Sequence, residues 1–349
     1  MENQEKQHKR RVRYKGTHPR NYKERYKELQ PEKYPETIEK VIRKGSTPVG
    51  MHISICVKEI LDFLQIQPGQ RGLDATLGYG GHTLEMLKCL KGEGHLYALD
   101  VDTVESAKTK ERLQKLGYGE EILTIKNINF RDIDKVCKEA GKFDFVLADL
   151  GVSSMQIDNP ERGFTYKKEG PLDLRLNQKK GVSAAERLKE VTMEELEGMF
   201  VENADEPYAH EIAEKIFAKL RRGEAIDTTT KLQQIIEEAL KFIPEEERKE
   251  AVKKSCQRTF QALRIDVNSE FEVLYEFMEK LPNVLKEGGR IAILTFHSGE
   301  DRIVKRAFKE LKRAGVYSDI ANDVIRPSAE ECNYNSRAKS TKMRWAIKA

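Results

Sequence analysis

The sequence contains no apolar run of about 18 residues, and its polar beginning, MENQEKQHKR, lacks the apolar centre of a secretion signal. These absences argue against a membrane partner and predict a cytoplasmic protein. Cysteine is also scarce, and no two of the five cysteines form a C-x-x-C pair, which favours neither a zinc site nor a disulfide framework. We therefore expect no metal. The cysteines are Cys56, Cys89, Cys137, Cys256 and Cys332.

Positive charge is concentrated at the N-terminal end. The whole chain carries a net charge of +4, whereas residues 1–50 hold 14 Lys and Arg against 7 Glu and therefore carry +7. This segment places tyrosines between its cations and has few aliphatic residues, so it cannot build a core. Such a composition suits contact with phosphates and stacking on bases, although a solubilising tail has the same composition. We predict a flexible basic extension over residues 1–50.

Short apolar runs alternate with helical stretches from about residue 52 onward. Helices between the first four runs predict a mostly parallel sheet with helices on its faces, the doubly wound α/β arrangement. A helix over Glu270–Leu285 and a KEGGR turn lead to the fifth run, and the final MRWAIKA is short and alternating enough for a closing edge strand. The five runs cover Gly72–Thr76, His95–Asp100, Ile122–Ile125, Phe143–Asp149 and Arg290–Phe296.

The alternation is interrupted between the fourth and fifth runs. Residues 158–258 show no convincing strand, and they contain capping-box patterns that begin at Thr192 and at Thr230. This predicts an all-helical domain over residues 158–258. It would be inserted into an α/β domain made of residues 51–157 and 259–349.

A glycine-rich turn, DATLGYGGHT, follows the first run and precedes a helical pattern. Gly78, Gly80 and Gly81 let the backbone approach a ligand closely, and the helix that follows presents free amides. Asp100 and Asp149 end the second and fourth strands, so we expect them beside the turn, at the carboxyl edge of the sheet where ligands gather. An acid at the place of Asp100 can accept hydrogen bonds from a ribose diol.

The spacing of this turn separates two cofactor classes. A nicotinamide fingerprint requires a third glycine at position 83, where this chain has Thr83. The pattern D-x-x-x-G-x-G, from Asp74 to Gly80, is instead expected of an S-adenosylmethionine site. A structural corner explains an isolated glycine motif equally well, but the two aspartates in register favour the cofactor.

Seven longer segments carry a resemblance to a known family. They are DATLGYGGHT, FVLADLGVSSMQIDNPERGF, GPLDLRLN, TFQALRIDVNSE, GGRIAILTFHSGEDRIVKR, IRPSAEE and SRAKSTKMR. From about His52 to the C-terminus, the chain closely resembles the bacterial small-subunit ribosomal RNA (cytosine-N4)-methyltransferases, the RsmH or MraW family. It departs from the usual pattern at Ala75, Leu77, Thr83 and Gly299, and its basic extension indicates a divergent branch or a paralog.

The resemblance implies a Rossmann-like, class I S-adenosylmethionine-dependent methyltransferase fold with an inserted helical domain that helps to hold RNA. It also implies methyl transfer to the exocyclic N4 of a cytosine in 16S ribosomal RNA, at the decoding centre of the small ribosomal subunit. Phe130 would lie against adenine or belong to the core, and His82 would cap or line the glycine turn or be structural. The predicted S-adenosylmethionine contacts are Gly78, Gly80, Gly81, His82, Asp100, Phe130, Asp149 and Gln156.

Asp149 is the predicted catalytic residue. The lone pair of an exocyclic amine is delocalised into the pyrimidine ring, and a hydrogen-bond acceptor beside the donor methyl favours a more pyramidal, nucleophilic nitrogen. No covalent nucleophile is needed, and none of the cysteines is expected near the crevice. Val152 stands where related enzymes often carry a base-stacking aromatic, so Phe164 and Phe296 are the candidate stackers, and each also fits a core position.

Polar residues after the fifth strand and in the C-terminal segment allow two interpretations. His297 could hold RNA or shape the cytosine pocket, whereas Ser298 as a helix cap, followed by Glu300 and Asp301, describes an ordinary helix start. The cations of SRAKSTKMR suit phosphate contact, and a solvated basic strand has the same composition. These cations are Arg337, Lys339, Lys342 and Arg344.

Two rival functions remain open. A non-catalytic RNA-binding or ribosome-assembly factor could keep the fold, but the intact Gly78, Gly80, Asp100 and Asp149 argue against it. A nicotinamide oxidoreductase is disfavoured by Thr83. A homodimer is a further prediction that the sequence does not decide.

Overall fold

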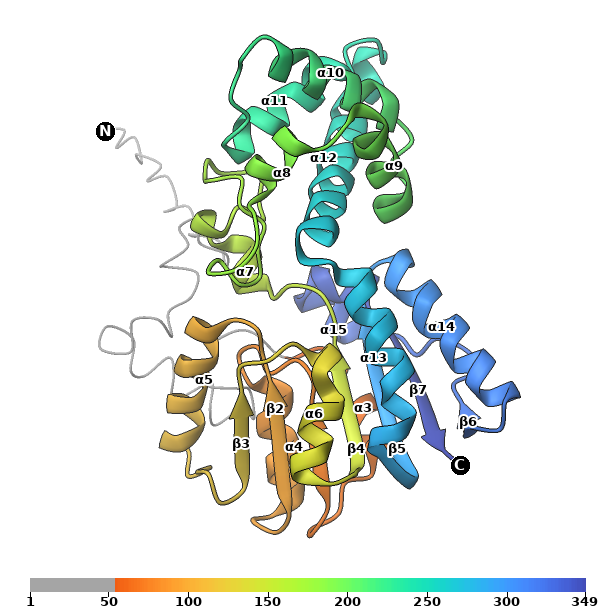
Figure 1. Cartoon of the computed structure of the whole chain (residues 1–349). Coiled ribbons are helices and arrows are strands. Elements are labelled where there is room, and N and C mark those ends of the chain that lie inside the picture. Colours follow the sequence, from red (N-terminus) through yellow and green to blue (C-terminus); the bar gives the residue numbers. More distant parts are fainter. Residues whose placement is uncertain (1–53) are drawn as a thin grey trace, which may run out of the picture. The chain divides into compact units, whose positions relative to one another are not determined.

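A seven-stranded sheet organises the part of the chain that the computed structural model describes, residues 54–349 without the side chains of Ser154, Tyr334 and Ser336 (Figure 1). The strand order is β3-β2-β1-β4-β5-β7-β6, and the first five strands pair in parallel. The predicted extension, residues 1–50, lies outside the described residues. The strands are β1 Arg71–Asp74, β2 His95–Leu99, β3 Leu123–Lys126, β4 Phe143–Asp149, β5 Leu285–Thr295, β6 Tyr317–Ile320 and β7 Lys342–Lys348.

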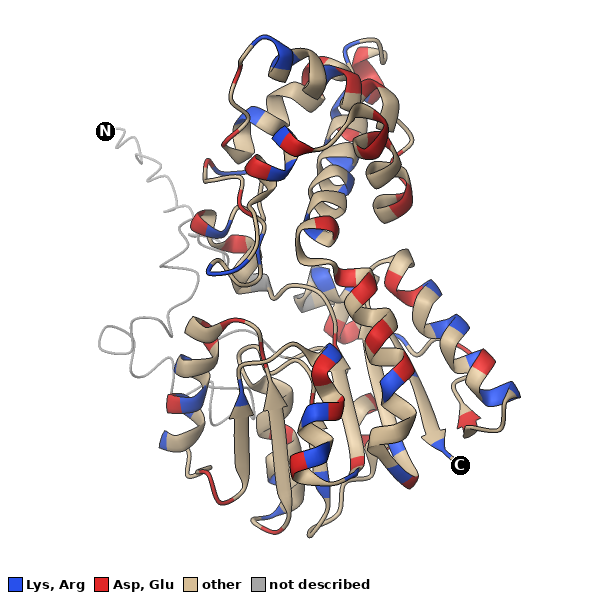
Figure 2. Ribbon diagram, in the orientation of Figure 1, with Lys and Arg blue, Asp and Glu red and all other residues tan. Residues whose placement is uncertain are grey.

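Helices cover both faces of this sheet. On β4, Phe145 and Leu147 pack into one core cluster, and Val146 and Ala148 pack into the other. Figure 2 shows the strands largely free of charge, with the charged residues carried by the helices. The predicted doubly wound α/β fold is therefore confirmed. The helices beside the strands are α3 Val57–Leu64, α4 Gly81–Leu90, α5 Thr103–Lys115, α6 Ile133–Ala140, α13 Glu270–Val284 and α14 Ser298–Arg313.

The C-terminal strands differ from the prediction. MRWAIKA belongs to β7, but β7 lies between β5 and β6 and is antiparallel to both, so it is not an edge strand. The edge is β6, whose sequence YSDI has an exposed centre and therefore gives little apolar signal. The KEGGR segment lies within β5, where Leu285 pairs with Phe143 and Arg290 pairs with Phe145 around Gly288 at φ +71°.

The segment predicted as an insertion is built of helices with a core of their own. Phe200, Ile212 and Leu232 are completely buried in this core. The last helix continues through residue 258 to Asn268, so the predicted border lies inside a helix and the exact domain limits stay a prediction. The helices are α8 Ala184–Glu190, α9 Met193–Ala204, α10 Ala209–Arg221, α11 Thr229–Ala239 and α12 Glu245–Asn268.

Local sequence signals position most of these helices. Thr192 caps α9 with the predicted capping box. The second capping prediction is wrong by two residues, because α11 begins earlier and Thr228, rather than Thr230, accepts a hydrogen bond from the amide of Lys231 at 3.3 Å. No described helix is both long enough and apolar enough to cross a bilayer. Shorter elements are η2 Phe130–Asp132, α7 Ser154–Asp158, η3 Pro160–Arg162, α15 Ala329–Tyr334 and η4 Ser336–Ser340.

Candidate active site

A tight corner carries β1 into α4. Gly78 and Gly80 take left-handed conformations, with φ +48° and +73°, that side chains strain to adopt. A Cβ atom on Gly80 would lie 2.7 Å from Cγ2 of Thr109, so packing against α5 also requires a glycine. Because α4 begins at Gly81, its first-turn amides lie at the carboxyl edge of the sheet, where they can bind a polar ligand.

Asp74, at the end of β1, fixes this corner. Its carboxylate accepts hydrogen bonds from the amide of Thr76 at 3.0 Å and from the hydroxyl of Thr83 at 2.6 Å. Burial raises the pKa of the Asp74 carboxyl. Thr83, which replaces the third glycine of a nicotinamide fingerprint, thus stabilises the turn from α4. The hydroxyl oxygen of Thr76 in turn accepts from the amide of Asp149 at 2.7 Å, which links the ends of β1 and β4.

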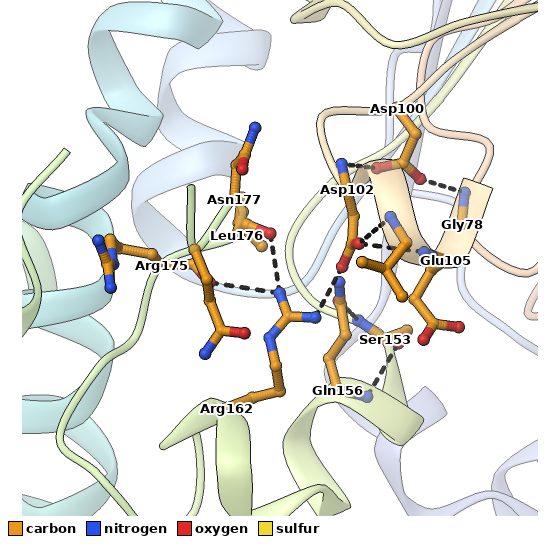
Figure 3. Close-up of polar contacts among 12 residues, drawn as sticks. Gly78, Asp100, Asp102, Glu105, Ser153, Gln156, Arg162, Arg175, Leu176 and Asn177 are labelled. Atoms are coloured by element: carbon orange, nitrogen blue, oxygen red, sulfur yellow. Dashed lines mark hydrogen bonds and ion pairs between the residues drawn. The ribbon is translucent and has the colours of Figure 1, made fainter. Parts of the chain in front are cut away.

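Asp100 reaches the glycine corner directly after β2. Its Oδ2 accepts a hydrogen bond from the amide of Gly78, and its Oδ1 accepts one from the amide of Asp102, both at 2.8 Å (Figure 3). Burial raises the pKa of Asp100 to about 6. Each carboxylate oxygen keeps a second acceptor site, so the group can also bind a pair of hydroxyls.

An ion pair between Asp102 and Arg162, which the sequence does not reveal, lies next to Asp100 and supports it. Asp102 caps α5 by accepting from the amides of Val104 and Glu105. Its Oδ2 accepts from Nη1 of Arg162 at 2.6 Å, and Arg162 is 9% exposed. Nη2 of Arg162 also donates to the carbonyl of Leu176 at 2.8 Å (Figure 3). The segment that opens the insertion is thereby tied to the strand end that carries Asp100.

His82 and Asp149 face each other at the other side of the corner. The imidazole is 8% exposed, its Nε2 lies 2.9 Å from the carbonyl oxygen of Ile55, and its Nδ1 lies 3.5 Å from Oδ2 of Asp149. The sequence predicts that His82 caps or lines the glycine turn or is structural, and the structure directs its ring to Ile55 and Asp149. Among the described residues, Oδ1 of Asp149 is buried without a hydrogen-bond partner.

The ionisation of Asp149 follows from its surroundings. Burial and the carboxylates of Asp74 and Glu300 together raise its pKa to about 6, against the opposing effect of His82. A buried oxygen without a donor is a costly feature in a folded protein. The end of β4 therefore presents a strong, unused hydrogen-bond acceptor.

The remaining predicted cofactor residues come from two short elements. Phe130 begins η2 after β3, and its ring is partly buried and stacks edge to face on Phe277 with centroids 5.1 Å apart. Gln156 lies in α7, where its Oε1 accepts from the amide of Ser153 at 2.9 Å in a capping box. The structure thus brings Gly78 to Asp100, and it holds Phe130 and Gln156 through local partners of their own.

The two candidate stacking aromatics differ in their surroundings. Phe164 is 9% exposed and packs into the core of the insertion, with the guanidinium of Arg162 above its ring at 5.7 Å. Phe296 follows β5 and is only partly buried, and its Cδ2 would lie 3.7 Å from a Cβ on Gly151. The core interpretation therefore holds for Phe164. Phe296, beside the loop after Asp149, stays the candidate stacker.

The start of α14 corrects one expectation from the sequence. Ser298 does not cap the helix, because the cap position falls on His297 and no side-chain capping bond forms there. Glu300 takes over part of this role by accepting from the amide of Phe296 at 2.9 Å, and its Oε1 lies 3.2 Å from Nε2 of His297. Glu300 is 3% exposed, so it acts as a structural acid behind the loop.

Three of the four C-terminal cations predicted to contact phosphate are paired within the fold. Arg344 is 5% exposed and donates to Asp301 at 2.7 Å, and Lys342 donates to the same carboxylate at 3.1 Å. The reason is the position of β7 inside the sheet, which turns these residues toward α14. Arg337 donates to Asp158 at 2.7 Å, while Lys339 is exposed and keeps the predicted phosphate contact open.

Cysteine does approach the site, contrary to the sequence expectation. Cys56 follows Ile55, the residue that bonds His82, and the charge of Asp149 acts on its thiol. Cys56 is fully buried, and burial raises the pKa of its thiol, so it stays protonated at neutral pH. It is therefore unsuited to act as a nucleophile.

Comparison with known proteins decides the family. The sequence model described as the MraW methylase family matches residues 50–349. The chain belongs to the MraW methylase family. The protein is accordingly a methyltransferase, and its sheet is the Rossmann-like methyltransferase fold expected from the motifs.

Curated relatives of this MraW protein carry one functional name. Ribosomal RNA small subunit methyltransferase H 1 of Lachnoclostridium phytofermentans is 72% identical, covering 100% of this chain and 95% of its own length. Ribosomal RNA small subunit methyltransferase H 2 of Alkaliphilus metalliredigens is 66% identical and covers 100% of both chains. Ribosomal RNA small subunit methyltransferase H of Clostridium botulinum is 38% identical, covering 84% of this chain and 97% of its own length.

Solved methyltransferases align with the MraW chain at low scores. An rRNA methylase from Streptococcus thermophilus covers 85% of this chain and 98% of its own, with a TM-score of 0.40 and 13% identity. A putative methyltransferase from Streptococcus mutans in complex with SAH covers 85% of this chain and 100% of its own, with a TM-score of 0.39 and 13% identity. Likenesses of this size do not bear on the site.

Proposed function

We propose that the protein transfers a methyl group from S-adenosylmethionine to the exocyclic N4 of a cytosine in 16S ribosomal RNA, at the decoding centre of the small subunit. The observation that carries this proposal is the unpartnered, buried Oδ1 of Asp149 at the end of β4, one strand from the glycine corner. An acceptor placed there suits an amino group that must lose a proton as its nitrogen is methylated.

The residues at the corner fit S-adenosylmethionine. Gly80 leaves no room for a side chain, so the backbone of the turn can lie close to a ligand. Asp100 offers two acceptor oxygens held in place by backbone amides, which suits a ribose diol. Phe130 and the side-chain amide NH₂ of Gln156 would complete the pocket. When bound, the cofactor supplies an electrophilic methyl group on a sulfonium sulfur.

The chain contributes alignment and a proton acceptor rather than a covalent nucleophile. Asp149 accepts a hydrogen bond from the N4 amino group, which draws the nitrogen lone pair out of conjugation with the ring. As the N–C bond forms and the S–C bond breaks, one N4 proton passes to the Asp149 carboxylate. Cys56, the thiol near this carboxylate, is protonated and takes no part.

Two measurements test this function. Calorimetric titration of the purified protein with S-adenosylmethionine should give binding in the micromolar range, about −8 kcal/mol. Mass-spectrometric mapping of small-subunit RNA from cells with and without the gene should locate one N4-methylcytidine that depends on it. Absence of cofactor binding would favour the alternative, a ribosome-assembly factor that keeps the fold. Binding without a gene-dependent methylcytidine would leave a methyltransferase with another target.

The basic extension supports a paralogous branch within the family. The family model begins at residue 50, and the relative from Clostridium botulinum covers 84% of this chain, whereas the relatives numbered H 1 and H 2 cover all of it. We propose that residues 1–50 add affinity for ribosomal RNA in the cytoplasm. A homodimer stays a prediction.

Deleting residues 1–45 tests the extension. Loss of its net positive charge should weaken RNA binding and flatten the dependence of log K on log salt, because fewer counterions are released. Cofactor affinity should not change. Binding isotherms at several salt concentrations measure the slope, and an unchanged slope would make the extension a solubilising tail.

A further inference from the structure

The two ring nitrogens of His82 have different partners, and this fixes the role of each. Nε2 lies 2.9 Å from the carbonyl oxygen of Ile55. A carbonyl oxygen can only accept, so Nε2 must carry a hydrogen and donate it. Nδ1 is therefore the nitrogen that faces Oδ2 of Asp149, at 3.5 Å.

The charges around this contact are mostly of one sign. Besides His82, the ionisable groups that act on Asp149 are the carboxylates of Asp74, on β1, and Glu300, on α14. The charge of Glu331, on α15, acts on Cys56 and is itself influenced by His82, while the Cys56 thiol is neutral. His82 is thus the basic group that faces an otherwise acidic cluster.

Proton placement across the contact has only one favourable arrangement. If Nδ1 lacked a hydrogen while Asp149 was ionised, a nitrogen lone pair would face a carboxylate oxygen, and the two would repel. One proton between Nδ1 and Oδ2 removes this repulsion. Oδ2 of Asp149 then faces the Nδ1 hydrogen of His82 at ion-pair distance, and Oδ1, which has no partner among the described residues, stays available for another donor.

We propose that His82 is a positioning residue that holds Asp149 in its anionic, proton-accepting form through the ion-pair contact between Nδ1 and Oδ2, 3.5 Å apart. This inference rests on the proposed N4 methyl transfer, in which Asp149 must be ionised when the amino group arrives. During transfer, the nitrogen lone pair forms the bond to the methyl carbon, and the S–C bonding pair goes to sulfur. The released N4 proton then goes to Oδ1 of Asp149. Without His82, burial and the neighbouring acids keep Asp149 protonated to higher pH, and the acceptor is lost.

The pH profile of turnover tests this role. In His82→Asn and His82→Gln, the acidic limb of kcat should move upward by about one pH unit, because the group that lowers the pKa of Asp149 is gone. Turnover at pH 6.5 should fall about threefold, and at pH 5 about tenfold, and it should recover above pH 8.5. The affinity for S-adenosylmethionine separates this role from the cofactor contact predicted for His82, because loss of a residue that only positions Asp149 should leave the affinity within about threefold.

A matched control uses His95, which lies at the amino ends of the parallel strands, whereas Asp149 lies at their carboxyl ends. His95 begins β2 and lies 2.8 Å from Oγ1 of Thr124, so His95→Asn removes a half-buried histidine away from Asp149. Its acidic limb should coincide with that of the wild type. Thermal unfolding of all variants checks that each one is folded, and if His82→Asn does not fold, the larger His82→Gln carries the test.

A second readout does not depend on turnover. Nitrogen NMR of protein labelled in its histidines should show a hydrogen on Nδ1 of His82 at pH 7, and this hydrogen should be lost in Asp149→Asn. An unshifted acidic limb together with an unchanged Nδ1 signal would overturn the inference. A large loss of cofactor affinity in the His82 variants would also overturn it, since His82 would then be a cofactor ligand. A wild-type enzyme that is inactive on RNA but keeps the Nδ1 signal would refute the proposed function and leave the proton contact standing.

Discussion

The ends of β2 and β4 carry the same residue type in different states. Asp100 and Asp149 are both aspartates, and burial raises the pKa of each to about 6. Both oxygens of Asp100 accept from backbone amides, at 2.8 Å each. Asp149 has one oxygen near a histidine and one with no partner among residues 54–349.

This difference separates a binding acid from a reacting acid. Two backbone amides fix the orientation of the Asp100 carboxylate, and a carboxylate of fixed orientation suits the binding of a ligand that does not react with it. An acid that lacks a donor is destabilised in the free protein and gains most when a donor arrives. Strain of this kind at an otherwise well-packed strand end is typical of functional sites.

Replacing Asp149 should give the largest effect. In Asp149→Asn and Asp149→Ala, turnover should fall at least about 100-fold, because the acceptor for the N4 proton is lost. The dissociation constant for S-adenosylmethionine should change by less than about threefold. Single-turnover transfer and calorimetry measure the two quantities, with Asp205→Asn as an exposed control. Near-normal turnover would remove Asp149 from the mechanism.

Replacing Asp100 should weaken cofactor binding and leave turnover nearly unchanged, the opposite of the effect of replacing Asp149. Asp100→Ala removes an acceptor that serves the amides of Gly78 and Asp102, and it also loses any bond to the ribose. We expect the dissociation constant for S-adenosylmethionine to rise about 10- to 100-fold, since hydrogen bonds to charged groups contribute about 1.5–3 kcal/mol. Turnover at saturating cofactor should change little. A fall in kcat with normal cofactor affinity would show that the two acids do not divide the work.

The free energy of unfolding should also distinguish Asp149 from Asp100. A buried acid whose folded pKa is about 6, above its unfolded value of 3.8, favours the folded state while protonated and loses this contribution as pH rises through 6. Asp149→Asn removes the penalty and should stabilise the fold by about 1–3 kcal/mol at pH 7.5, with no gain at pH 4. Asp100→Asn should show no such gain, because an amide NH₂ would face a backbone NH. Thermal unfolding at the two pH values measures this difference, and equal gains for both variants would contradict it.

The main features of the fold could be predicted because they depend on local patterns. Apolar runs separated by helical stretches predict the parallel strands. Acids that directly follow such runs are expected at the carboxyl edge of the sheet, and this is where Asp100 contacts the glycine corner. The edge strand β6 was missed because YSDI is short and half exposed. The direction of the His82 ring was missed because it depends on Ile55, 27 residues away.

Long-range ion pairs were beyond the sequence signal. Arg344 was expected to contact phosphate, and its burial against Asp301 depends on β7 entering the sheet. Asp102 is recognisable as a helix cap, but nothing near it in the sequence points to Arg162, 60 residues away. A charged residue shows its charge in the sequence, whereas its partner is determined only by the fold.

Arg162 provides the smallest and most specific test of how the binding acid is held. Its pair with Asp102 is nearly buried, and Asp102 in turn donates its amide to Asp100. Arg162→Lys keeps the charge but cannot span Asp102 and the Leu176 carbonyl with one planar fork, so we expect cofactor affinity to fall about threefold to tenfold. Arg187→Lys is the matched control, because Arg187 pairs with Asp266 at 2.8 Å inside the insertion. Calorimetry with S-adenosylmethionine measures both variants. Equal losses would mean that the insertion as a whole supports the cofactor site, and a loss confined to Arg162→Lys would assign that support to the single contact behind Asp100.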